Sequence, residues 1–361
     1  MASSARQWIG KPQTAFVNAP QLAISCAGSG YCLAENRVTN EDLEKLGYDD
    51  QWIVQRTGIR SRHVAPAHQS TSDLAYEAGM SCLKNAGVAP EEVDLIMVAT
   101  CTPDHIAPSV SCIVQDRMGC HQAAAFDVNA ACSGFMYAYI TASQYVSSGC
   151  FSNVLVIGAD VLSRVINPAD QKTFPLFGDG AAAILLQPAG SRVVGSHGYS
   201  TTVPMQNDPG ILGFQLGAEG GLGKSLLFPA GGSREPITHE GLDAGRQFLN
   251  MDGRTVFKWA VQMIPQVISQ LMVRCQFDIN DVSLFVLHQA NTRILDAAME
   301  SLGVPAERVF SNVQKYGNTC AASVPLVLAE AQEAGKIKSG DHIVLCGFGA
   351  GLTWGTALVR W

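Results

Sequence analysis

The chain has 361 residues, of which 47% are hydrophobic and 15% charged, and its formal net charge is −7. No hydrophobic run reaches the ~18 residues of a membrane span, and no Lys/Arg cluster offers a surface for nucleic acid, so we expect neither as a partner. Eleven cysteines without a C-x-x-C pair indicate reduced thiols and a cytoplasmic protein.

The first part of the chain gives a few local predictions. Residues 1–20 contain no continuous apolar segment and are expected to be a flexible leader. Residues 22–28 predict a strand that ends in a glycine turn, and Thr39 predicts the cap of a short helix. Residues 50–60 are too mixed in composition for an ordinary amphipathic helix.

Apolar strands and helical patterns alternate after this point. The spacing predicts helix 72–85, strand 94–100, strand 124–128, a helix starting near Cys132, and strand 153–160. Strand, helix and strand in succession, with mostly apolar strands, favour a parallel sheet covered on both faces.

The second half of the chain repeats this pattern. Strand 282–291 is followed by a helix, a small-residue turn at 316–322, helix 324–334 and strand 341–347. The chain therefore looks internally duplicated, with one half at 21–190 and the other at 191–361. Residues 197–237, rich in Gly and Pro, are expected to be a loop region that borders a site.

Cys132 is the candidate nucleophile. It stands where the strand 124–128 gives way to a helix, so unpaired amide hydrogens and the positive end of the helix favour its thiolate. Its small neighbours let a substrate carbonyl approach the backbone. A buried structural cysteine is the alternative, and for a single cysteine taken alone it is the more common case.

His288 and Asn318 are expected at equivalent ends of the sheet, near Cys132. Taken alone, His288 is more often a core or surface histidine, and Asn318 beside a glycine is more often a turn residue. Together they can donate hydrogen bonds to one developing oxyanion, while backbone amides of Cys132 and of the turn 349–351 serve another. The remaining histidines show no spacing with cysteine or acid that indicates a metal site.

Five motifs resemble those of β-ketoacyl-acyl carrier protein synthase III, of the thiolase superfamily. The resemblance runs from about residue 22 to residue 361, with the motifs in the order of the family. It implies an α/β fold with five layers, αβαβα, built from two similar halves, and a homodimer. The motifs are Asp127–Phe135, Phe177–Ala181, His288–Arg293, Tyr316–Thr319 and Gly347–Gly351.

The resemblance also implies an acyltransferase reaction. An acyl-coenzyme A primer acylates Cys132, and malonyl-acyl carrier protein then loses carbon dioxide to form an enolate that attacks the Cys132 thioester. His288 and Asn318 stabilise the enolate, and the amides of Cys132 and Ala350 hold the tetrahedral oxyanion. No cofactor is implied beyond the coenzyme A thioester, which is a substrate.

The same resemblance assigns binding residues. Trp52, Arg56 and Asn291 match positions that hold coenzyme A or its pantetheine arm. From spacing alone, Trp52 and Arg56 indicate only a surface aromatic side chain with the aliphatic part of an arginine packed against it. Lys258 and Arg293 match basic residues that meet the acidic carrier protein. The acyl pocket is assigned to Ala107, Phe135 and Phe348.

Two positions depart from the family pattern. Gln171 stands where many members have an arginine at the adenine end of coenzyme A. Whether the primer arrives on coenzyme A or on a carrier protein is therefore left open. Ala107 stands where some members place a bulky aromatic that closes the acyl pocket across the dimer, so we expect a primer longer or more branched than acetyl.

Other functions remain open at this point. A relative of the same fold could start a polyketide or an alkylquinolone, or transfer the acyl group to oxygen. A catalytically silent acyl-binding subunit is a further alternative, since fold alone does not determine function. A cysteine hydrolase is the weakest, because the Cys132 thioester would have to be open to water.

Overall fold

The structure is a computed structural model that describes residues 22–189, 191–194, 200–203 and 207–361. The expected leader, residues 1–20, lies outside the described residues. None of the helices among the described residues is both long enough and apolar enough to cross a membrane.

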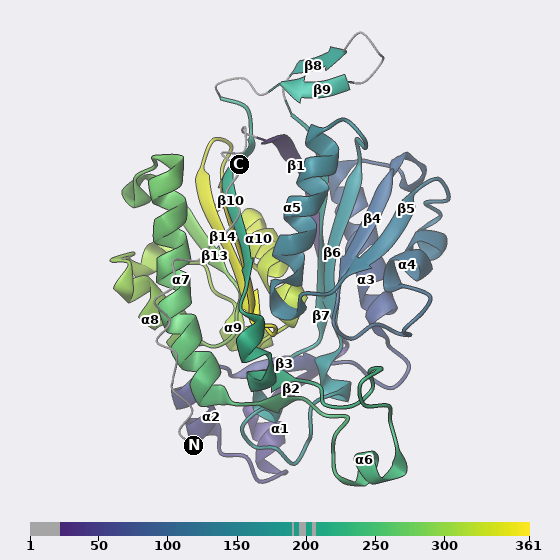
Figure 1. Cartoon of the computed structure of the whole chain (residues 1–361), viewed down its shortest axis with the longest axis vertical. Helices are drawn as coiled ribbons and strands as arrows, with labels where there is room; N and C mark the ends of the chain where they lie inside the picture. Colours follow the sequence, from purple (N-terminus) through teal and green to yellow (C-terminus); the bar gives the residue numbers. More distant parts are fainter. Residues whose placement is uncertain (1–21, 190, 195–199, 204–206) are drawn as a thin grey trace.

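Five layers of secondary structure make up the molecule (Figure 1). Helices α5 and α10 lie between two sheet layers, α7 and α8 cover one outer face, and α3 and α4 cover the other. This is the αβαβα architecture expected from the sequence. The outer helices are α7 (Gly253–Cys275) and α8 (Thr292–Ser301) on one face, and α3 (Thr71–Ala86) and α4 (Val110–Met118) on the other; the central helices are α5 (Gly134–Ser147) and α10 (Ser323–Glu333). The sheet layer under α7 and α8 contains β13 (Leu284–Leu287), β14 (His342–Gly349), β15 (Thr353–Arg360) and β10 (Gly210–Ala218). The sheet layer under α3 and α4 contains β1 (Leu22–Leu33), β7 (Gly180–Pro188), β6 (Val154–Asp160), β4 (Leu95–Ala99) and β5 (Ala124–Val128).

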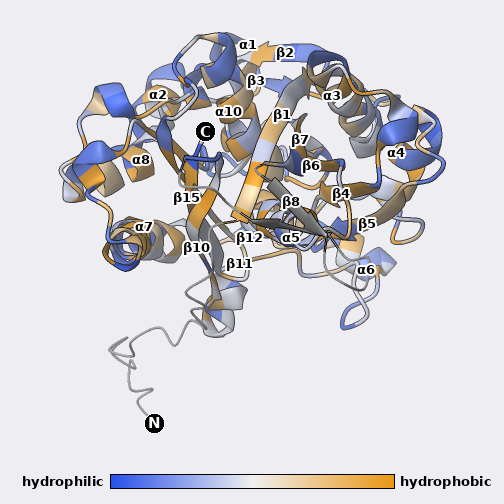
Figure 2. Cartoon of the chain, turned by 90° about the horizontal axis from the view of Figure 1, so that it is seen from above, coloured by the Kyte–Doolittle hydropathy of each residue, from blue (hydrophilic) through white to orange (hydrophobic). Residues whose placement is uncertain are grey.

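The central strands are buried on both faces, which explains their continuous apolar sequences. Along β4, Leu95 and Met97 pack into the inner layer with α5 and α10, whereas Ile96 and Val98 pack outward against α3 and α4. This alternation follows from the two-residue period of a strand. Seen from above, hydrophobic colour lies mainly on the strands, while the outer helix α4 is largely hydrophilic (Figure 2).

The strand pairing repeats between the two halves. In the first half, β4 pairs in parallel with β6, β6 pairs antiparallel with β7, and β7 pairs antiparallel with β1. In the second half, β13, β14, β15 and β10 repeat these three pairings in the same order. The halves join where β1 meets β10 at two residue pairs, Leu22 with Ile211 and Ala23 with Gly210. The duplication expected from the pattern is therefore present in the topology, while the boundary between 190 and 191 stays a prediction.

Four local predictions are wrong. The sheet is mixed rather than parallel, because β7 and β15 turn back antiparallel. Residues 197–237, expected as a loop region, contain the nine-residue strand β10. The strand from Leu22 does not end in a glycine turn but continues to Leu33 through a bulge at residues 26–28. Residues 50–57 form helix α2, because Asp49 caps its first turn and Gly58 ends it in the left-handed conformation.

Smaller elements lie at both ends of the layers: β8 and β9 at one end, and α1, α2, β2, β3 and α6 at the other (Figure 1). Thr39 caps α1 as predicted, through a reciprocal hydrogen bond with Asp42. The strand pairs outside the large sheet are β2 with β3, β8 with β9 and β11 with β12. The bounds are β2 (Asn36–Thr39), β3 (Ser61–Val64), α1 (Asn40–Glu44), α2 (Asp50–Thr57), β8 (Ser191–Val194), β9 (Ser200–Val203), β11 (Leu226–Leu227), β12 (Asn250–Met251), α6 (His239–Asp243) and α9 (Val313–Tyr316).

Candidate active site

Cys132 lies on the turn between β5 and α5, as the sequence predicts. A single 3-10 turn, Ala131–Ser133, carries it, and α5 begins at Gly134. Ala131 has a φ of 46°, so the chain bends sharply just before the thiol. On the other side, a Cβ at Gly349 would lie 2.7 Å from the Cβ of Cys132, so this position requires a glycine. The backbone thus approaches the nucleophile closely from two sides.

Asn318 lies on the corresponding turn of the second half. Its Oδ1 accepts a hydrogen bond from the amide of Cys320 at 2.9 Å, just as Asn129 Oδ1 accepts from the amide of Ala131 at 3.2 Å in the first half. The amide of Asn318 also donates to the carbonyl of Leu176 at 2.8 Å. With Oδ1 and the backbone fixed, the side-chain NH2 of Asn318 remains as a donor toward the cavity that Asn318 lines.

His288 follows β13 and is 1% exposed. Its Nδ1 lies 2.5 Å from the hydroxyl of Ser323, and that hydroxyl oxygen also accepts a hydrogen bond from the amide of Gln289 at 3.4 Å. The hydrogen bond to Ser323 occupies Nδ1 and fixes the orientation of the ring. The ring packs edge-on against Phe348, with centroids 5.0 Å apart. Nε2 is therefore the ring nitrogen left for a ligand in the cavity, which His288 lines.

The thiol of Cys132 is set up to ionise. A hydrogen bond with Cys320 lowers the pKa of Cys132 from its ordinary value of 9.0, burial opposes this effect, and His288 lowers the pKa further through its charge and a hydrogen bond. The result is a pKa of about 5 for Cys132. The sequence reasoning gave the end of a helix as the cause, whereas the structure adds Cys320 and His288.

Alkylation of Cys132 by iodoacetamide is expected to be nearly independent of pH between about pH 6.5 and 8.5, because a thiol with a lowered pKa is already ionised there. In the denatured chain, with a cysteine pKa near ~8.5, the rate should rise about tenfold per pH unit below that value. Peptide mass mapping of the Cys132 peptide measures the rate. In Cys320→Ala, the alkylation rate of Cys132 should begin to depend on pH and should rise at higher pH than in the wild type. A folded-state profile that follows the denatured chain would contradict the assignment of a thiolate.

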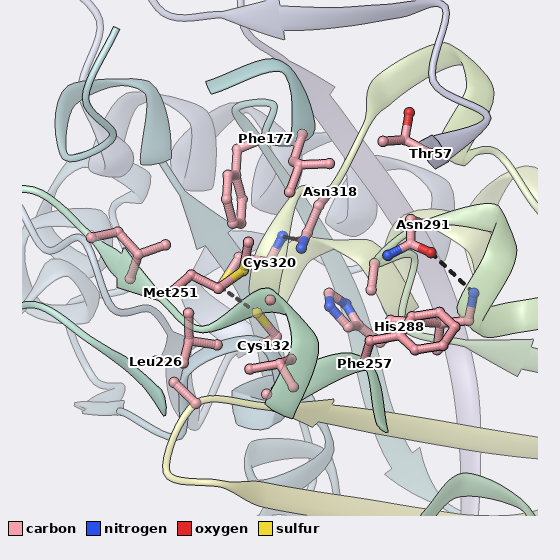
Figure 3. A pocket seen from close by; sticks show the side chains of 18 of the residues that line it. Thr57, Cys132, Phe177, Leu226, Met251, Phe257, His288, Asn291, Asn318 and Cys320 are labelled. Atoms are coloured by element: carbon pink, nitrogen blue, oxygen red, sulfur yellow. Dashed lines mark hydrogen bonds between the residues drawn. The ribbon is translucent and has the colours of Figure 1, made fainter. Parts of the chain in front are cut away.

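A cavity of about 660 Å³ contains all three predicted residues, Cys132, His288 and Asn318 (Figure 3). Cys132 and Asn318 are only 8% and 7% exposed, so the reacting groups lie deep in the protein. Next to Cys132 the wall is apolar and carries no carboxylate. This end of the cavity is lined by Leu162, Phe177, Leu226, Phe228, Leu249 and Met251.

The mouth of the cavity is basic. Arg56, Lys258 and Arg293, which the sequence singled out, line it together with Lys172 and Arg254, which it did not. All five are exposed. No aspartate or glutamate is found among the described residues that line the cavity. In a chain with a net charge of −7, this local excess of positive charge favours an anionic ligand.

Two aromatic contacts shape the same mouth. The guanidinium of Arg56 lies 4.7 Å from the ring centre of Trp52, and that of Arg293 lies 5.4 Å from the ring centre of Phe257. Asn291 caps α8, and its Oδ1 accepts from the amide of Ile294 at 3.0 Å. Trp52 and Asn291 both line the cavity, so the structure brings the residues predicted for coenzyme A together.

Three other predicted positions do not line this cavity. Phe135 is fully buried in the layer between the sheets, where it stacks on Tyr139, so its ring faces the core and not the thiol. Ala107 is exposed on the loop before α4. Gln171 is exposed and donates a 3.4 Å hydrogen bond to the carbonyl of Gly47. Of the three residues assigned to the acyl pocket, Phe348 alone lines the cavity.

Two cysteines that the sequence reasoning passed over line the cavity as well. Cys320 Sγ lies 3.3 Å from Cys132 Sγ and 3.7 Å from Cys101 Sγ. Cys101, Cys320 and Asp160 place three possible metal-ligand atoms within 4.8 Å of one another. Both carboxylate oxygens of Asp160 already accept hydrogen bonds, from Cys101, Ala321 and two threonines, so they hold the backbone rather than a metal ion.

Comparison with known proteins gives matches over almost the whole chain. Two family models match, "3-Oxoacyl-[acyl-carrier-protein (ACP)] synthase III" at residues 126–202 and the "C terminal" model of the same name at residues 272–361. A beta-ketoacyl-[acyl-carrier-protein] synthase III from Rhodopirellula baltica is 52% identical over 341 residues, which are 94% of this chain and 98% of that protein.

Solved structures agree with these sequence matches. The 3-oxoacyl-[acyl-carrier-protein] synthase III of Aquifex aeolicus superposes with a TM-score of 0.82 at 38% identity, covering 94% of this chain and 100% of the other. A priming β-ketosynthase of a polyketide pathway superposes with a TM-score of 0.83 at 31% identity, covering 94% and 97%.

Proposed function

The chain belongs to the 3-oxoacyl-[acyl-carrier-protein] synthase III family, and on this premise we propose that it joins an acyl-coenzyme A primer to malonyl-acyl carrier protein and so initiates fatty acid synthesis. The reaction is a decarboxylative Claisen condensation that passes through an acyl-Cys132 intermediate. One observation carries this proposal: a low-pKa thiol, an imidazole oriented by Ser323 and an amide donor converge on one cavity with a basic mouth.

In the first step, the Cys132 thiolate attacks the carbonyl carbon of the primer thioester. Coenzyme A leaves as a thiolate that takes up a proton, and the acyl group stays on Cys132. The backbone amides of Cys132 and Ala350 hold the tetrahedral oxyanion. The close approach of Gly349 and the lining position of Ala350 support this role, because they bring a second backbone segment to the thiol.

In the second step, malonyl-acyl carrier protein loses carbon dioxide and leaves a thioester enolate. His288 Nε2 and the Asn318 amide donate to the enolate oxygen, and the enolate carbon attacks the acyl-Cys132 carbonyl. The hydrogen bond between Ser323 and Nδ1 supports this role, because it fixes the ring and leaves Nε2 for the enolate. The product is a β-ketoacyl-acyl carrier protein, and the Cys132 thiolate is regenerated.

The basic mouth supports the assignment of the two carriers. Trp52, Arg56 and Asn291 bind coenzyme A or the pantetheine arm, whose phosphate groups are anionic. Lys258 and Arg293 meet the acidic carrier protein, and Lys172 and Arg254 extend the same surface. No cofactor is proposed beyond the coenzyme A thioester.

The primer is proposed to be longer or more branched than acetyl. Support comes from the apolar wall beside Cys132, which Leu162, Phe177 and Leu249 help to form. Ala107 lies on a loop outside this chain's own cavity, so it affects the pocket only if a second copy presents that loop. Ile106, beside it, is 94% exposed, which fits a side chain that a partner covers.

A homodimer is proposed on the same grounds. Strand β5 is an edge of the sheet, and its Phe126 is 37% exposed, so its open edge and apolar side chain favour pairing with a second copy.

The cytoplasm is proposed as the compartment. Its support is that all eleven cysteines are free thiols in the structure.

The test of the function is the intact mass of the protein after incubation with straight and branched acyl-coenzyme A primers, followed by malonyl-acyl carrier protein. We expect one acyl group per chain, and its removal as a β-ketoacyl-acyl carrier protein when the malonyl carrier is added. Malonyl-coenzyme A in place of the carrier serves as the control and should remove the acyl group more slowly. A preference for acetyl of more than about tenfold, about 1.4 kcal/mol, would defeat the proposed primer class. Failure to load any primer would defeat the proposal as a whole.

The alternative of a polyketide or alkylquinolone starter, or of acyl transfer to oxygen, is not favoured. The polyketide priming synthase is less similar to this chain, at 31% identity, than the relative from Rhodopirellula baltica at 52%. The same experiment separates these reactions, because each gives a different carrier-bound or oxygen-bound product.

A further inference from the structure

Three thiols from three separate segments meet at the base of the cavity. Cys132 comes from the turn before α5, Cys320 from the turn before α10, and Cys101 from the residues that follow β4. Cys320 Sγ lies 3.3 Å from Cys132 Sγ (Figure 3) and 3.7 Å from Cys101 Sγ. All three line the cavity, so a small molecule that reaches Cys132 also reaches Cys320.

The segments that carry Cys101 and Cys320 are fixed to one buried carboxylate. Asp160, which is 0% exposed, accepts hydrogen bonds from the amide of Cys101 at 2.8 Å and from the amide of Ala321 at 3.0 Å. The amide of Cys320 is bound in turn by Asn318 Oδ1 at 2.9 Å. The backbone on both sides of Cys320 is therefore held in place where its side chain meets Cys132.

The two sulfurs in contact have opposite protonation preferences. The hydrogen bond with Cys320 and the neighbouring His288 lower the pKa of Cys132, whereas hydrogen bonds to Cys101 and Cys132, together with burial, hold the pKa of Cys320 well above 9.0. The thiolate is the sulfur that a hydroperoxide oxidises first, while Cys320 keeps its proton until that stage and must lose it to attack the oxidised sulfur. Forming a bond requires the sulfurs to approach by about 1.3 Å, to the ~2.05 Å of a disulfide.

We propose that Cys320 is a resolving cysteine for Cys132, so that the cavity is also a modification site for small hydroperoxides and stores the oxidised nucleophile as a Cys132–Cys320 disulfide. This inference depends on the positions of the thiols alone and goes beyond the condensation reaction. The condensation mechanism itself gives Cys320 no chemical step.

The chemistry balances with the hydroperoxide as the oxidant. The Cys132 thiolate attacks one peroxide oxygen; an S–O bond forms, the O–O bond breaks, and hydroxide or an alkoxide leaves. Cys320 then attacks the sulfenic sulfur and loses its proton; the S–S bond forms, the S–O bond breaks, and water leaves. Two electrons pass from the two sulfurs to the peroxide, and a dithiol reverses the change by exchange.

The consequence is reversible loss of the nucleophile. A disulfide prevents Cys132 from taking an acyl group, but it also prevents further oxidation to sulfinic and sulfonic acids, which dithiols do not reduce. Cys320 thus converts permanent damage at the cavity thiolate into a state that reduction restores.

The experiment treats the acyl-free protein with hydrogen peroxide and maps non-reduced peptides by mass. For the wild type we expect a Cys132–Cys320 cross-linked peptide with two hydrogen atoms fewer, at least about a tenfold fall in activity, and recovery of activity with dithiothreitol. Cys320→Ser is close to the wild-type side chain in size. In this variant we expect Cys132 to gain two or three oxygen atoms, and its activity to stay lost after dithiothreitol.

Two control variants test whether the disulfide is specific to Cys132 and Cys320. Cys101→Ser should keep the Cys132–Cys320 disulfide, because it leaves both sulfurs of that 3.3 Å contact in place. Cys150→Ser, on an exposed thiol outside the cavity, should behave as the wild type. Oxygen addition to Cys132 in the wild type without a disulfide, or equal recovery of Cys320→Ser, overturns the proposal. The mass map does not need condensing activity, so it remains decisive whatever the enzyme's substrates are.

Discussion

Replacing Cys132 with alanine is expected to abolish acyl loading and to lower turnover by more than about 10⁴-fold, because removing the nucleophile of a covalent mechanism leaves no group for the acyl intermediate. The substitution removes one sulfur atom at the base of an open cavity, so the fold should be retained. Intact mass after incubation with a loading primer measures the acyl group directly.

The same variant should still release carbon dioxide from malonyl-acyl carrier protein. His288 and Asn318 remain in place, since Ser323 and the amide of Cys320 hold them independently of the Cys132 side chain. Cys320→Ala is the matched control: it removes the neighbouring sulfur but leaves the nucleophile, and it should load the primer. Acylation of Cys132→Ala at wild-type level would show that another residue is the nucleophile.

The strands and the turn around Cys132 could be predicted because burial on both faces makes the sequence itself informative. β4, β6, β13 and β14 are short, mainly apolar runs, and polar or small residues follow the carboxyl ends of β4, β13 and β14. Cys132 follows such a run and begins a helical pattern. Its position on the turn therefore follows from local sequence, its partners His288 and Asn318 follow from the equivalent strand and turn ends of the second half, and the family motifs agree with both.

β10 was missed because its glycines were read as turn residues. A Cβ at Gly217 would lie 2.2 Å from the ring of Trp354, and one at Gly213 would lie 2.4 Å from Cys275 Sγ. These glycines are required by side chains that pack across the strand, not by a change of chain direction. Sequence alone does not distinguish the two causes, because the neighbours are more than fifty residues away.

Helix α2 was missed for a different reason. Its composition carries no strong amphipathic pattern, but Asp49 caps the start and Gly58 ends the helix, so the capping residues were the available signal. The 23-residue helix α7 also had a signal, since Met263, Val267 and Leu271 recur at four-residue intervals on its buried face.

The composition of the cavity could not be predicted from spacing. Lys172 and Arg254 join the basic mouth from segments more than eighty residues apart, and Cys101 reaches Cys320 from more than two hundred residues away. Phe135 shows the opposite case: the family resemblance assigned it to the acyl pocket, but its ring packs in the core between the sheets and does not line the cavity.

Replacing Asn318 with aspartate is expected to separate the two half-reactions. The carboxylate keeps an oxygen that accepts from the amide of Cys320, so the turn is preserved, but it removes the NH2 donor and adds a charge that repels the enolate. Loss of one such donor costs about 10²–10³-fold, so decarboxylation and condensation should fall by that factor. Acyl loading of Cys132 should change far less, because Asn318 is not assigned to the oxyanion of the first step.

Single-turnover measurements distinguish these steps: the rate of mass gain with primer reports loading, and the rate of carbon dioxide release reports the second step. The chain offers a matched control in Asn129→Asp, where the same side-chain oxygen accepts from the amide of Ala131 in the corresponding turn of the first half, but the residue is exposed and does not line the cavity. This control should leave both rates near wild type. If Asn318→Asp slowed loading as much as decarboxylation, the amide would stabilise both the tetrahedral oxyanion and the enolate. The assignment of the first to the backbone amides and of the second to His288 and Asn318 would then be wrong.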